Sequence, residues 1–519
     1  MLDQFLGKAF WVTYGLLAVA YIAGFLTINT PVAYGLTALT ALITFVVSVR
    51  RLEFGLLIAF AELIATSHGH LFPYARIAIF AAVMLAWGIH FLRGRRPNIK
   101  HEVFLPFLLL FAAVAWGVYM GFRFGNAKTD ILNDGNAYLY VLYLLPILTV
   151  EWTSAVKRLL LQVFAGAAGF VIDLTLVILY LFTHLSEPVQ RAMYTFFRDA
   201  RIAELTRVVG DIFRVFLQAQ FFTMILLFIV LAAVFWFWKS RRDQNAIAIV
   251  IIGCLSTLII SMSRSFWIGM IAALPVIIVA VFIAKRPKAK EVMKVSAAGV
   301  LMLIASVATL WFVLAFPFPQ ARNVSGFGSY LSDRVSSSDA AISSRWNLLP
   351  EMNREITEHT IFGSGFGTII AFESDDPRVR ETYPDGKWRT YAFEWGWHDA
   401  LIKMGILGPV ALLWIGWVMG AGLLRGFKKE TGWLSIGLFA GLVALYATHV
   451  FSPYLNHPIG LGYLLFLIPF LTPKTQKASE EAMVPIADII RAEFRTPVQT
   501  PASSSVSSLR VEPSDSEGA

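Results

Sequence analysis

The chain has few charged side chains and almost no cysteine, and both shortages restrict what it can be. Only 15% of its 519 residues are Asp, Glu, Lys or Arg, whereas 57% are hydrophobic. A soluble domain carries about 25% charged residues. The single cysteine, Cys254, lies inside an apolar run, so a disulfide framework is excluded. The net charge of +9 gathers on no soluble basic face, which excludes a nucleic-acid-binding protein.

Long apolar runs, in contrast, recur from one end of the chain to the other. A helix needs about 20 apolar residues to cross a bilayer. These runs predict an all-α fold, a polytopic transmembrane helical bundle of about 14 spans. The predicted spans are 9–28, 31–49, 53–67, 75–92, 103–121, 136–151, 159–183, 214–238, 246–262, 266–284, 295–316, 398–424, 432–450 and 458–472.

The distribution of Lys and Arg orients this bundle. Basic residues gather in every second connection, at 50–51, 93–96, 157–158, 239–242, 285–290, 425–429 and 474–477. The short alternate connections at 29–30, 68–74 and 451–457 carry none. The positive-inside rule therefore places both termini in the cytoplasm and puts one large loop, 317–397, outside.

This orientation suggests four regions. Residues 1–200 form N-terminal transmembrane helices, and 201–430 form a core that includes the extracytoplasmic loop 317–397. Residues 431–472 form the C-terminal transmembrane helices. The Ser/Pro/Glu-rich segment 473–519 is expected to be a disordered cytoplasmic tail.

One arginine interrupts a stretch that is otherwise purely apolar. Between residues 246 and 284 the only charged side chain is Arg264, in "SMSRSFWIG". The stretch is too long for one span, so it predicts two helices with a tight turn at Arg264, on the outer side. Ser263 and Ser265 flank it, and the planar guanidinium suits a lipid-linked phosphate. The alternative is an arginine that merely snorkels to the interface.

Further arginines fall on the same predicted side. Arg207 and Arg214 lead into the span 214–238, and Arg345 and Arg354 lie on an amphipathic helix predicted over 343–359 behind a serine cap. Nine residues separate Arg345 from Arg354, so they point to opposite sides of that helix, and Arg345 beside Trp346 is the better candidate for the site. Each of these arginines taken singly also fits a solvated salt bridge.

Two other stretches add candidates. "TIFGSGFGT" has glycines at 363, 365 and 367, which permit positive φ and close approach of a ligand or another backbone, with Gly365 at the centre. In "WGWHDALIKMGILG", His398 is a candidate general base and Asp399 a candidate helix cap or substrate contact. His398 also fits an interfacial histidine in an aromatic belt. No ligand spacing predicts a metal site or a cofactor.

The order of these motifs is distinctive. "RVVG", "SRSFW", "SSRW", "GSGFG" and "HD…MGILG" follow one another between about residues 200 and 425, all on the predicted outer side. This order resembles the O-antigen ligase and O-antigen (exopolysaccharide) polymerase superfamily, whose members are membrane glycosyltransferases of lipopolysaccharide and polysaccharide biosynthesis. Asp399 stands where the family usually has Asn, and Arg214 and Phe216 stand where it often has Pro-Asn.

The resemblance implies a GT-C-like fold in the bacterial inner membrane, with the active site on the periplasmic side. It implies an undecaprenyl-diphosphate-linked glycan as donor, and a glycan or lipid A core as acceptor. The family's two arginines that hold the diphosphate correspond to Arg264 and Arg345, and its histidine corresponds to His398. Arg207, Arg214, Ser263, Ser265, Gly365 and Asp399 are then candidate substrate contacts. Because several arginines can stabilise a diphosphate leaving group, a metal-independent transferase is expected.

Three alternatives stay open at this point, one of which is an inactive, structural member of the superfamily. A lipid A core acceptor makes the protein a ligase, and a second lipid-linked unit makes it a polymerase, the slightly favoured option, with a chain-length regulator as a partner. A lipid-linked-glycan flippase can also have about 14 spans. A flippase, however, is expected to carry several charges inside its spans, and here only Glu62 and Asp173 lie there.

Overall fold

The helices of the protein follow its apolar runs. The computed structural model describes residues 5–67, 69–209, 212–319, 340–374, 379, 383 and 385–472. Residues 1–476 form one compact unit. The predicted tail 473–519 and the loop segment 320–339 lie outside the described residues.

Long helices alternate along the chain with short helices and two hairpins. The first half contains α2 (Lys8–Thr27), α3 (Pro31–Arg50), α4 (Leu52–Thr66), α5 (Ala75–Leu92), α6 (His101–Arg123), α7 (Lys128–Gly135), the 3₁₀ helix η1 (Asn136–Tyr143), α8 (Leu144–Thr149), α9 (Ser154–His184), α10 (Glu187–Asp199), β1 (Glu204–Val209) and β2 (Ile212–Phe216). The second half contains α11 (Gln220–Phe237), α12 (Arg241–Ser261), α13 (Arg264–Lys285), α14 (Ala289–Ala315), α16 (Ala340–His359), β3 (Ile370–Glu373), β4 (Lys387–Thr390), α18 (Gly396–Met404), α19 (Leu407–Leu424), α20 (Gly432–Phe451), η2 (Tyr454–Asn456), α21 (Pro458–Leu467) and η3 (Ile468–Phe470).

The all-α polytopic architecture is confirmed. Among the described residues, 11 helices are long and apolar enough to cross a membrane: α2, α3, α5, α6, α9, α11, α12, α13, α14, α19 and α20. The remaining predicted spans are shorter or irregular. Helix α4 has 15 residues, about 22 Å of helix. Residues 136–149 combine η1 with α8, and 458–470 combine α21 with η3.

Two of these shorter segments, 136–149 and 458–470, nevertheless join the two ends of the bundle. Asn136 lines a cavity at one end, whereas the carbonyl of Leu148 accepts a hydrogen bond from the backbone of Asn98, just before α6 begins. Pro458 lines the same cavity, and Thr472 bonds to Gly422 near the far end of α19. The predicted alternation of the chain between the two ends is therefore preserved.

The centre of the bundle is formed by the helices whose apolar side chains are covered on all sides. Helices α9, α11 and α20 are the most buried of the long helices, and α11 packs against both α9 and α20. Helices α2, α3 and α14 expose large apolar side chains, including Trp11, Leu42 and Phe312. Exposed apolar faces of this kind suit contact with lipid.

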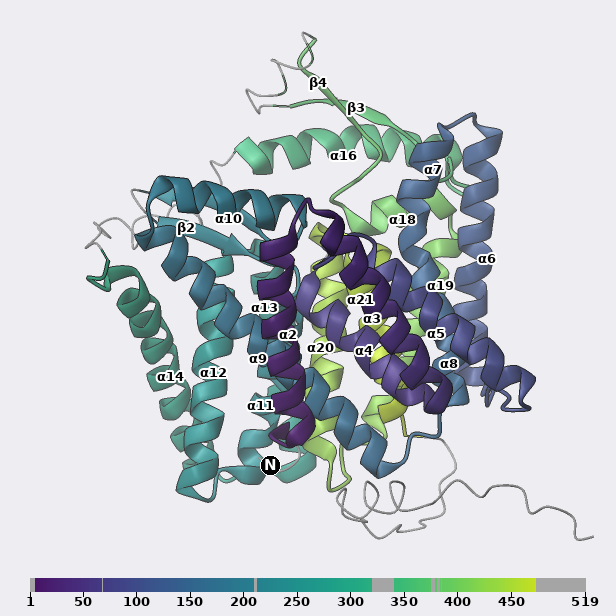
Figure 1. Cartoon of the computed structure of the whole chain (residues 1–519). Helices are drawn as coiled ribbons and strands as arrows, with labels where there is room; N and C mark the ends of the chain where they lie inside the picture. The colour runs from purple at the N-terminus through teal and green to yellow at the C-terminus, as the bar shows by residue number, and fades with distance from the viewer. Residues whose placement is uncertain are drawn as a thin grey trace, which may run out of the picture. The chain divides into compact units, whose positions relative to one another are not determined.

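One end of the bundle carries nearly all the structure that does not cross it (Figure 1). Helices α7, α10, α16 and α18 and the hairpins β1–β2 and β3–β4 lie there, and we call it the loop end. Both hairpins are antiparallel two-stranded sheets. In the first, Thr206 pairs with Arg214 and Arg207 with Phe213. In the second, Ile370 pairs with Thr390.

Two predicted spans differ from the observed elements. The span 214–238 is wrong at its start, because residues 212–216 form a strand and α11 begins only at Gln220. The span 398–424 is broken, because Gly405 has a φ of 60° and separates α18 from α19. This positive φ is one that glycine adopts far more readily than other residues. Both errors lie at the loop end, where local contacts outweigh the apolar pattern.

Candidate active site at the loop end

The turn at Arg264 joins two antiparallel helices, as the sequence predicts. Helix α12 ends at Ser261, and Met262 adopts the left-handed conformation with φ 49°. Ser263 is extended and precedes Arg264, the first residue of α13. The turn is two residues long, so the half-buried Arg264 side chain starts directly at the N-terminus of a helix. A helix N-terminus favours negative charge, which complements the guanidinium in binding an anion.

The side chains around this turn are hydrogen-bonded to one another. The hydroxyls of Ser263 and Ser265 are 3.0 Å apart, and both residues are buried. The Arg214 guanidinium donates from Nε to the carbonyl oxygen of Ser261 at 2.8 Å. This carbonyl belongs to the last turn of α12, where no intrahelical donor remains. Arg214 therefore reaches the turn from strand β2, whereas the predicted position was the start of a span.

Arg207 lies on the other strand of the same hairpin. It is exposed and stands opposite Phe213, one register step away from the Thr206–Arg214 pair. Successive side chains on a strand point to opposite faces. Arg207 is thus one position along the hairpin from the pair that contains Arg214, and its side chain points to the opposite face from that of Thr206.

Helix α16 carries Arg345, as predicted. The helix extends back to Ala340, so Ser343 and Ser344 lie within it and the predicted serine cap is wrong. Arg345 forms an ion pair with Glu394, and Trp395 donates from its indole nitrogen to the carbonyl oxygen of Arg345 at 3.0 Å. These contacts fix α16 against the segment that leads into α18.

The remaining arginine of α16, Arg354, pairs with Glu351 at 2.6 Å on the solvent side. Its side chain is 69% exposed, against 40% for Arg345. Of the two arginines, Arg345 is thus the one attached to the rest of the loop end.

His398 lies in the first turn of α18 and is half-buried. The ring of Trp395 packs edge-on against it, with centroids 6.1 Å apart. Burial lowers the pKa of His398 below the ordinary value of 6.5. The imidazole is therefore neutral at pH 7 and able to accept a proton.

Asp399 is buried in an ionic network and does not cap α18, because the N-cap position is Trp395. Its carboxylate pairs with Lys403 at 2.5 Å and accepts a hydrogen bond from the Asn456 amide. Lys403 also pairs with Asp134 of α7 at 2.5 Å. Burial raises the pKa of Asp399 to about 6; Lys403 opposes the rise and Asp134 adds to it. This network joins α7, α18 and η2.

The three glycines between 363 and 367 bring backbone against backbone. All three have positive φ, and Gly365 has a φ of 87°. A side chain at Gly365 would overlap the backbone of Gly121 in α6. The amide nitrogen of Phe366 donates to the carbonyl of Gly117 at 3.0 Å. The close approach expected from the sequence is therefore to helix α6.

We expect Gly365→Ala to destabilise the protein by about 2–4 kcal/mol, because it combines left-handed strain with an overlap that the α6 backbone cannot avoid. Gly88→Ala is the matched control, since a methyl group there meets nothing within 4 Å in the middle of α5. Thermal unfolding of the two purified variants checks this. Equal midpoints for both variants would contradict the packing described for Gly365.

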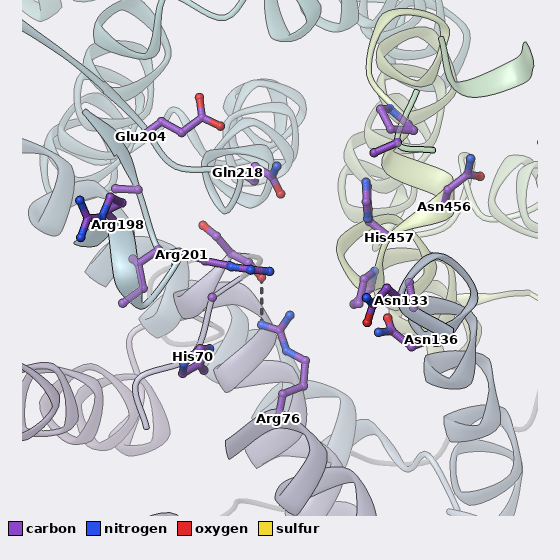
Figure 2. A pocket seen from close by; sticks show the side chains of 18 of the residues that line it. His70, Arg76, Asn133, Asn136, Arg198, Arg201, Glu204, Gln218, Asn456 and His457 are labelled. Carbon is purple, nitrogen blue, oxygen red and sulfur yellow. Dashed lines mark hydrogen bonds between the residues drawn. The ribbon is translucent and has the colours of Figure 1, made fainter. Parts of the chain in front are cut away.

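A cavity of about 1190 Å³ opens at the loop end. Figure 2 shows its two polar walls, with His70, Arg76, Arg198, Arg201 and Glu204 on one side and Asn133, Asn136, Asn456 and His457 across from them. Asp134, Asp399 and Lys403 also line it. Burial lowers the pKa of His457 to about 4, with a smaller contribution from Lys403, so this ring is neutral at pH 7.

The predicted residues form two groups beside this cavity. Arg345 and His398 are linked through Trp395, which contacts both. Arg214, Ser263, Arg264 and Ser265 gather at the α12–α13 turn. Asp399 lines the cavity directly.

Helix α20 connects the two groups. The Thr448 hydroxyl donates to the carbonyl of Ser265 at 3.2 Å. The ring of the adjacent His449 packs edge-on against Trp397, next to His398, at 4.9 Å. Phe216 lines the cavity and packs on Phe266, two residues after Arg264. The two groups therefore lie at the same end of the bundle, and their neighbours Phe216 and Asp399 line the cavity, whereas Arg264, Arg345 and His398 are not among the described residues that line it.

Several cavity residues escaped sequence reasoning. Arg76 lies far from the motifs in sequence, Arg198 and Arg201 lie shortly before "RVVG", and Lys403 lies inside "WGWHDALIKMGILG" but was not singled out. One signal did exist: Glu62 falls inside a span and needs a partner. That partner is Arg76, whose guanidinium donates to both carboxylate oxygens of Glu62 at 3.0 and 3.2 Å. The other predicted intramembrane acid, Asp173, accepts a hydrogen bond from Tyr14 at 2.6 Å.

Comparison with known families identifies one segment of the chain. Residues 248–413 match the family model described as O-antigen ligase. This segment contains the α12–α13 turn, α16, the glycine run and α18, and so includes Arg264, Arg345 and His398. No curated protein matches the chain. The match confirms the resemblance to the O-antigen ligase and polymerase superfamily.

Proposed function

Because the chain is a multi-pass membrane protein with an O-antigen ligase segment at residues 248–413, we propose that it transfers a glycan from an undecaprenyl-diphosphate carrier to a glycan acceptor. The reaction takes place on the periplasmic side of the bacterial inner membrane. One observation carries the proposal: the matched segment contributes Arg264, Arg345 and His398 to the loop end of the bundle, the end at which a cavity of about 1190 Å³ opens.

The arginines have a clear role in this chemistry. Transfer breaks the bond between the anomeric carbon of the sugar and a diphosphate oxygen, which leaves a highly charged group on the carrier. Arg264, at the N-terminus of α13, and Arg345, on α16, are proposed to stabilise that charge with planar, charge-assisted hydrogen bonds. Because they supply the compensating charge, the proposed mechanism needs no metal ion. Arg214 and the Ser263–Ser265 pair hold the turn in place.

His398 is proposed to take the proton of the acceptor. The acceptor hydroxyl oxygen forms the new bond to the anomeric carbon, and its proton passes to the neutral imidazole as undecaprenyl diphosphate leaves. The lowered pKa of His398 keeps the base in its neutral form at pH 7. Trp395 orients the ring and ties it to Arg345.

The acceptor distinguishes a polymerase from a ligase. We favour a polymerase that joins lipid-linked units, with a chain-length regulator as partner, and a ligase to the lipid A core is the other member of the same class. Deleting the gene in its host tests both. Loss of a ligase leaves long glycans on undecaprenyl diphosphate, whereas loss of a polymerase leaves only single repeat units. Unchanged glycans in the deletion strain would refute the proposed function.

The side of the membrane can be tested with introduced cysteines, because the single native cysteine is buried and replaceable. In a Cys254→Ser background, we expect Asp385→Cys, in the turn between β3 and β4, to react with an impermeant maleimide in cells with a permeabilised outer membrane. The control is Lys288→Cys, exposed before α14 in a basic connection, which reacts only after the inner membrane is opened. The opposite labelling pattern would place the site in the cytoplasm.

A further inference from the structure

Arg201 occupies a backbone position where glycine is the usual residue. Helix α10 ends in a Schellman motif: the amide of Ile202 donates to the carbonyl of Phe197, and the amide of Arg201 donates to that of Arg198. In this motif the residue just before Ile202, most often glycine, has to be in the left-handed conformation. Here Arg201 adopts it with a φ of 52°. A strained, long, charged residue points to a role for its side chain where the site also lines a cavity, as Arg201 does.

The neighbouring turn holds Arg201 in place. The amide nitrogen of His70 donates to the carbonyl of Ala200 at 2.9 Å. A side chain at Gly69 would overlap this same carbonyl and the backbone of Arg201. The hydroxyl of Ser67 accepts a hydrogen bond from the amide of Ala219 at 2.9 Å, which anchors the turn to the start of α11. The Arg201 position is thus built by contacts between distant parts of the chain.

Of the three arginines on this wall, Arg201 is the one not committed to a carboxylate. Arg76 is bound to Glu62, and Arg198 pairs with Asp199 at 2.8 Å. Within the part of the chain that the structure describes, Arg201 forms no ion pair, and it is exposed in the cavity. The pKa of His70 is lowered by burial and then by the charges of Arg201 and Arg76, while Glu62 opposes the shift. Glu204 also lines this wall, so Arg201 is the cation on it that can meet an anionic ligand.

The opposite wall has a different chemistry. Asn133 and Asn136 present neutral amides there, which donate and accept hydrogen bonds as sugar hydroxyls do (Figure 2). The Asn456 amide beside them is bonded to Tyr138 and Asp399. Tyr34, Tyr74, Tyr194 and Tyr391 also line the cavity and offer flat apolar faces for sugar rings. A ligand that satisfies both walls carries hydroxyl groups on one side and an anionic group on the other.

We infer that the wall formed by His70, Arg198 and Arg201 binds an acidic sugar of the glycan, one that bears a carboxylate or a comparable anionic substituent. The inference rests on the proposed function and names its substrate class. The wall lies outside the segment 248–413, to which the diphosphate contacts Arg264 and Arg345 belong. It therefore supplies a second anion contact, and this contact selects the glycan.

Because the Arg201 backbone is strained, a glycine substitution can remove the side chain without lowering stability. Arg201→Gly removes the side chain and relieves the left-handed backbone, so we expect thermal stability at least equal to wild type. We also expect the preference for an acidic sugar to fall about tenfold or more, the loss typical of one charge-assisted hydrogen bond. The matched control is Arg286→Gly. Arg286 has the same conformation, with a φ of 47°, after α13 and does not line the cavity.

Binding is measured on the full-length protein in nanodiscs with three probes: trigalacturonic acid, its trimethyl ester and undecaprenyl diphosphate. Wild type and Arg286→Gly should bind the acid at least about tenfold more tightly than the ester. Arg201→Gly should bind acid and ester alike and should retain wild-type affinity for undecaprenyl diphosphate.

Three results would overturn this inference while leaving the proposed function intact. The first is a wild type that binds undecaprenyl diphosphate but does not distinguish acid from ester. The second is an Arg201→Gly variant that still distinguishes them. The third is an Arg201→Gly variant whose affinity for undecaprenyl diphosphate falls, which assigns the wall to the carrier. If the wild type shows no measurable affinity for undecaprenyl diphosphate, the proposed function itself is contradicted, and the inference with it.

Discussion

Arg264→Lys is expected to lose glycan transfer by about 10²–10³-fold, the scale of removing one preorganised donor to a developing charge. Lysine keeps the positive charge but lacks the planar fork that engages two phosphate oxygens at once. Arg264 begins directly at the N-terminus of α13, so a shorter point charge there cannot reproduce the contact. Glycan transfer in membranes from cells with matched protein levels measures the effect.

A conservative substitution elsewhere controls for the loss of arginine as such. Arg286→Lys, at the opposite end of α13, is expected to leave transfer unchanged. Arg345→Ala and His398→Ala should be similarly severe, and each should cost less in an Arg264→Lys background, because groups that serve one transition state act as a unit. Near-normal transfer by Arg264→Lys would remove the diphosphate role from this residue and favour an interfacial arginine.

Lys403→Met is expected to destabilise the protein by about 3–5 kcal/mol, the cost of leaving buried charge without its partner. The Lys403 side chain is 5% exposed and lies within 2.5 Å of both Asp134 and Asp399, whose side chains are 9% and 2% exposed. Methionine fills a similar volume but leaves two carboxylates facing each other. A lower unfolding temperature and a lower yield of purified protein report the effect.

The control removes the charges together. A triple variant that adds Asp134→Asn and Asp399→Asn to Lys403→Met should recover a large part of the lost stability, since no unpaired charge remains. Transfer activity is not expected to recover, because Asp399 and Lys403 line the cavity. A single Lys403→Met variant as stable as wild type would show that the network does not hold α7 and α18 together.

The sequence predicted the bundle well because long apolar runs have few alternatives in a bilayer. A run such as 246–284 has to be helical wherever it crosses the lipid, since unpaired backbone groups are costly there. The one polar interruption then fixed the turn, which lies at Met262 and Ser263. The alternation of Lys- and Arg-rich connections with connections that lack them then assigned each connection to one end of the bundle.

Prediction failed where the chain leaves the apolar layer. Nothing in the apolar pattern distinguishes a strand at 212–216 from the start of a helix, because tertiary contacts such as Arg214 with Ser261 decide it. The apolar pattern also cannot distinguish the 3₁₀ segment 136–143 from part of a regular span. Its rings at Tyr140 and Tyr143 stack edge-on at 4.8 Å, as residues three apart do in a 3₁₀ helix.

The candidate site was accessible from sequence only in part. Arg264, Arg345 and His398 occur in motifs whose order is itself informative. The second wall of the cavity requires Arg201 of the α10 terminus to meet His70 of the α4–α5 turn, and the network requires Lys403 to meet Asp134 across 269 positions. Contacts between such distant residues depend on the packing of the whole bundle, which local patterns do not encode.

The most direct test of the proposed transfer is the reaction of the purified chain in proteoliposomes that contain the host's lipid-linked glycan, in the presence of EDTA. We expect free undecaprenyl diphosphate to appear as the glycan is joined to its acceptor, at a rate unaffected by EDTA and reduced about 10²–10³-fold in Arg264→Lys. The proposed transfer is contradicted if the lipid-linked glycan crosses the bilayer with its diphosphate bond intact, or if the wild-type chain releases no undecaprenyl diphosphate.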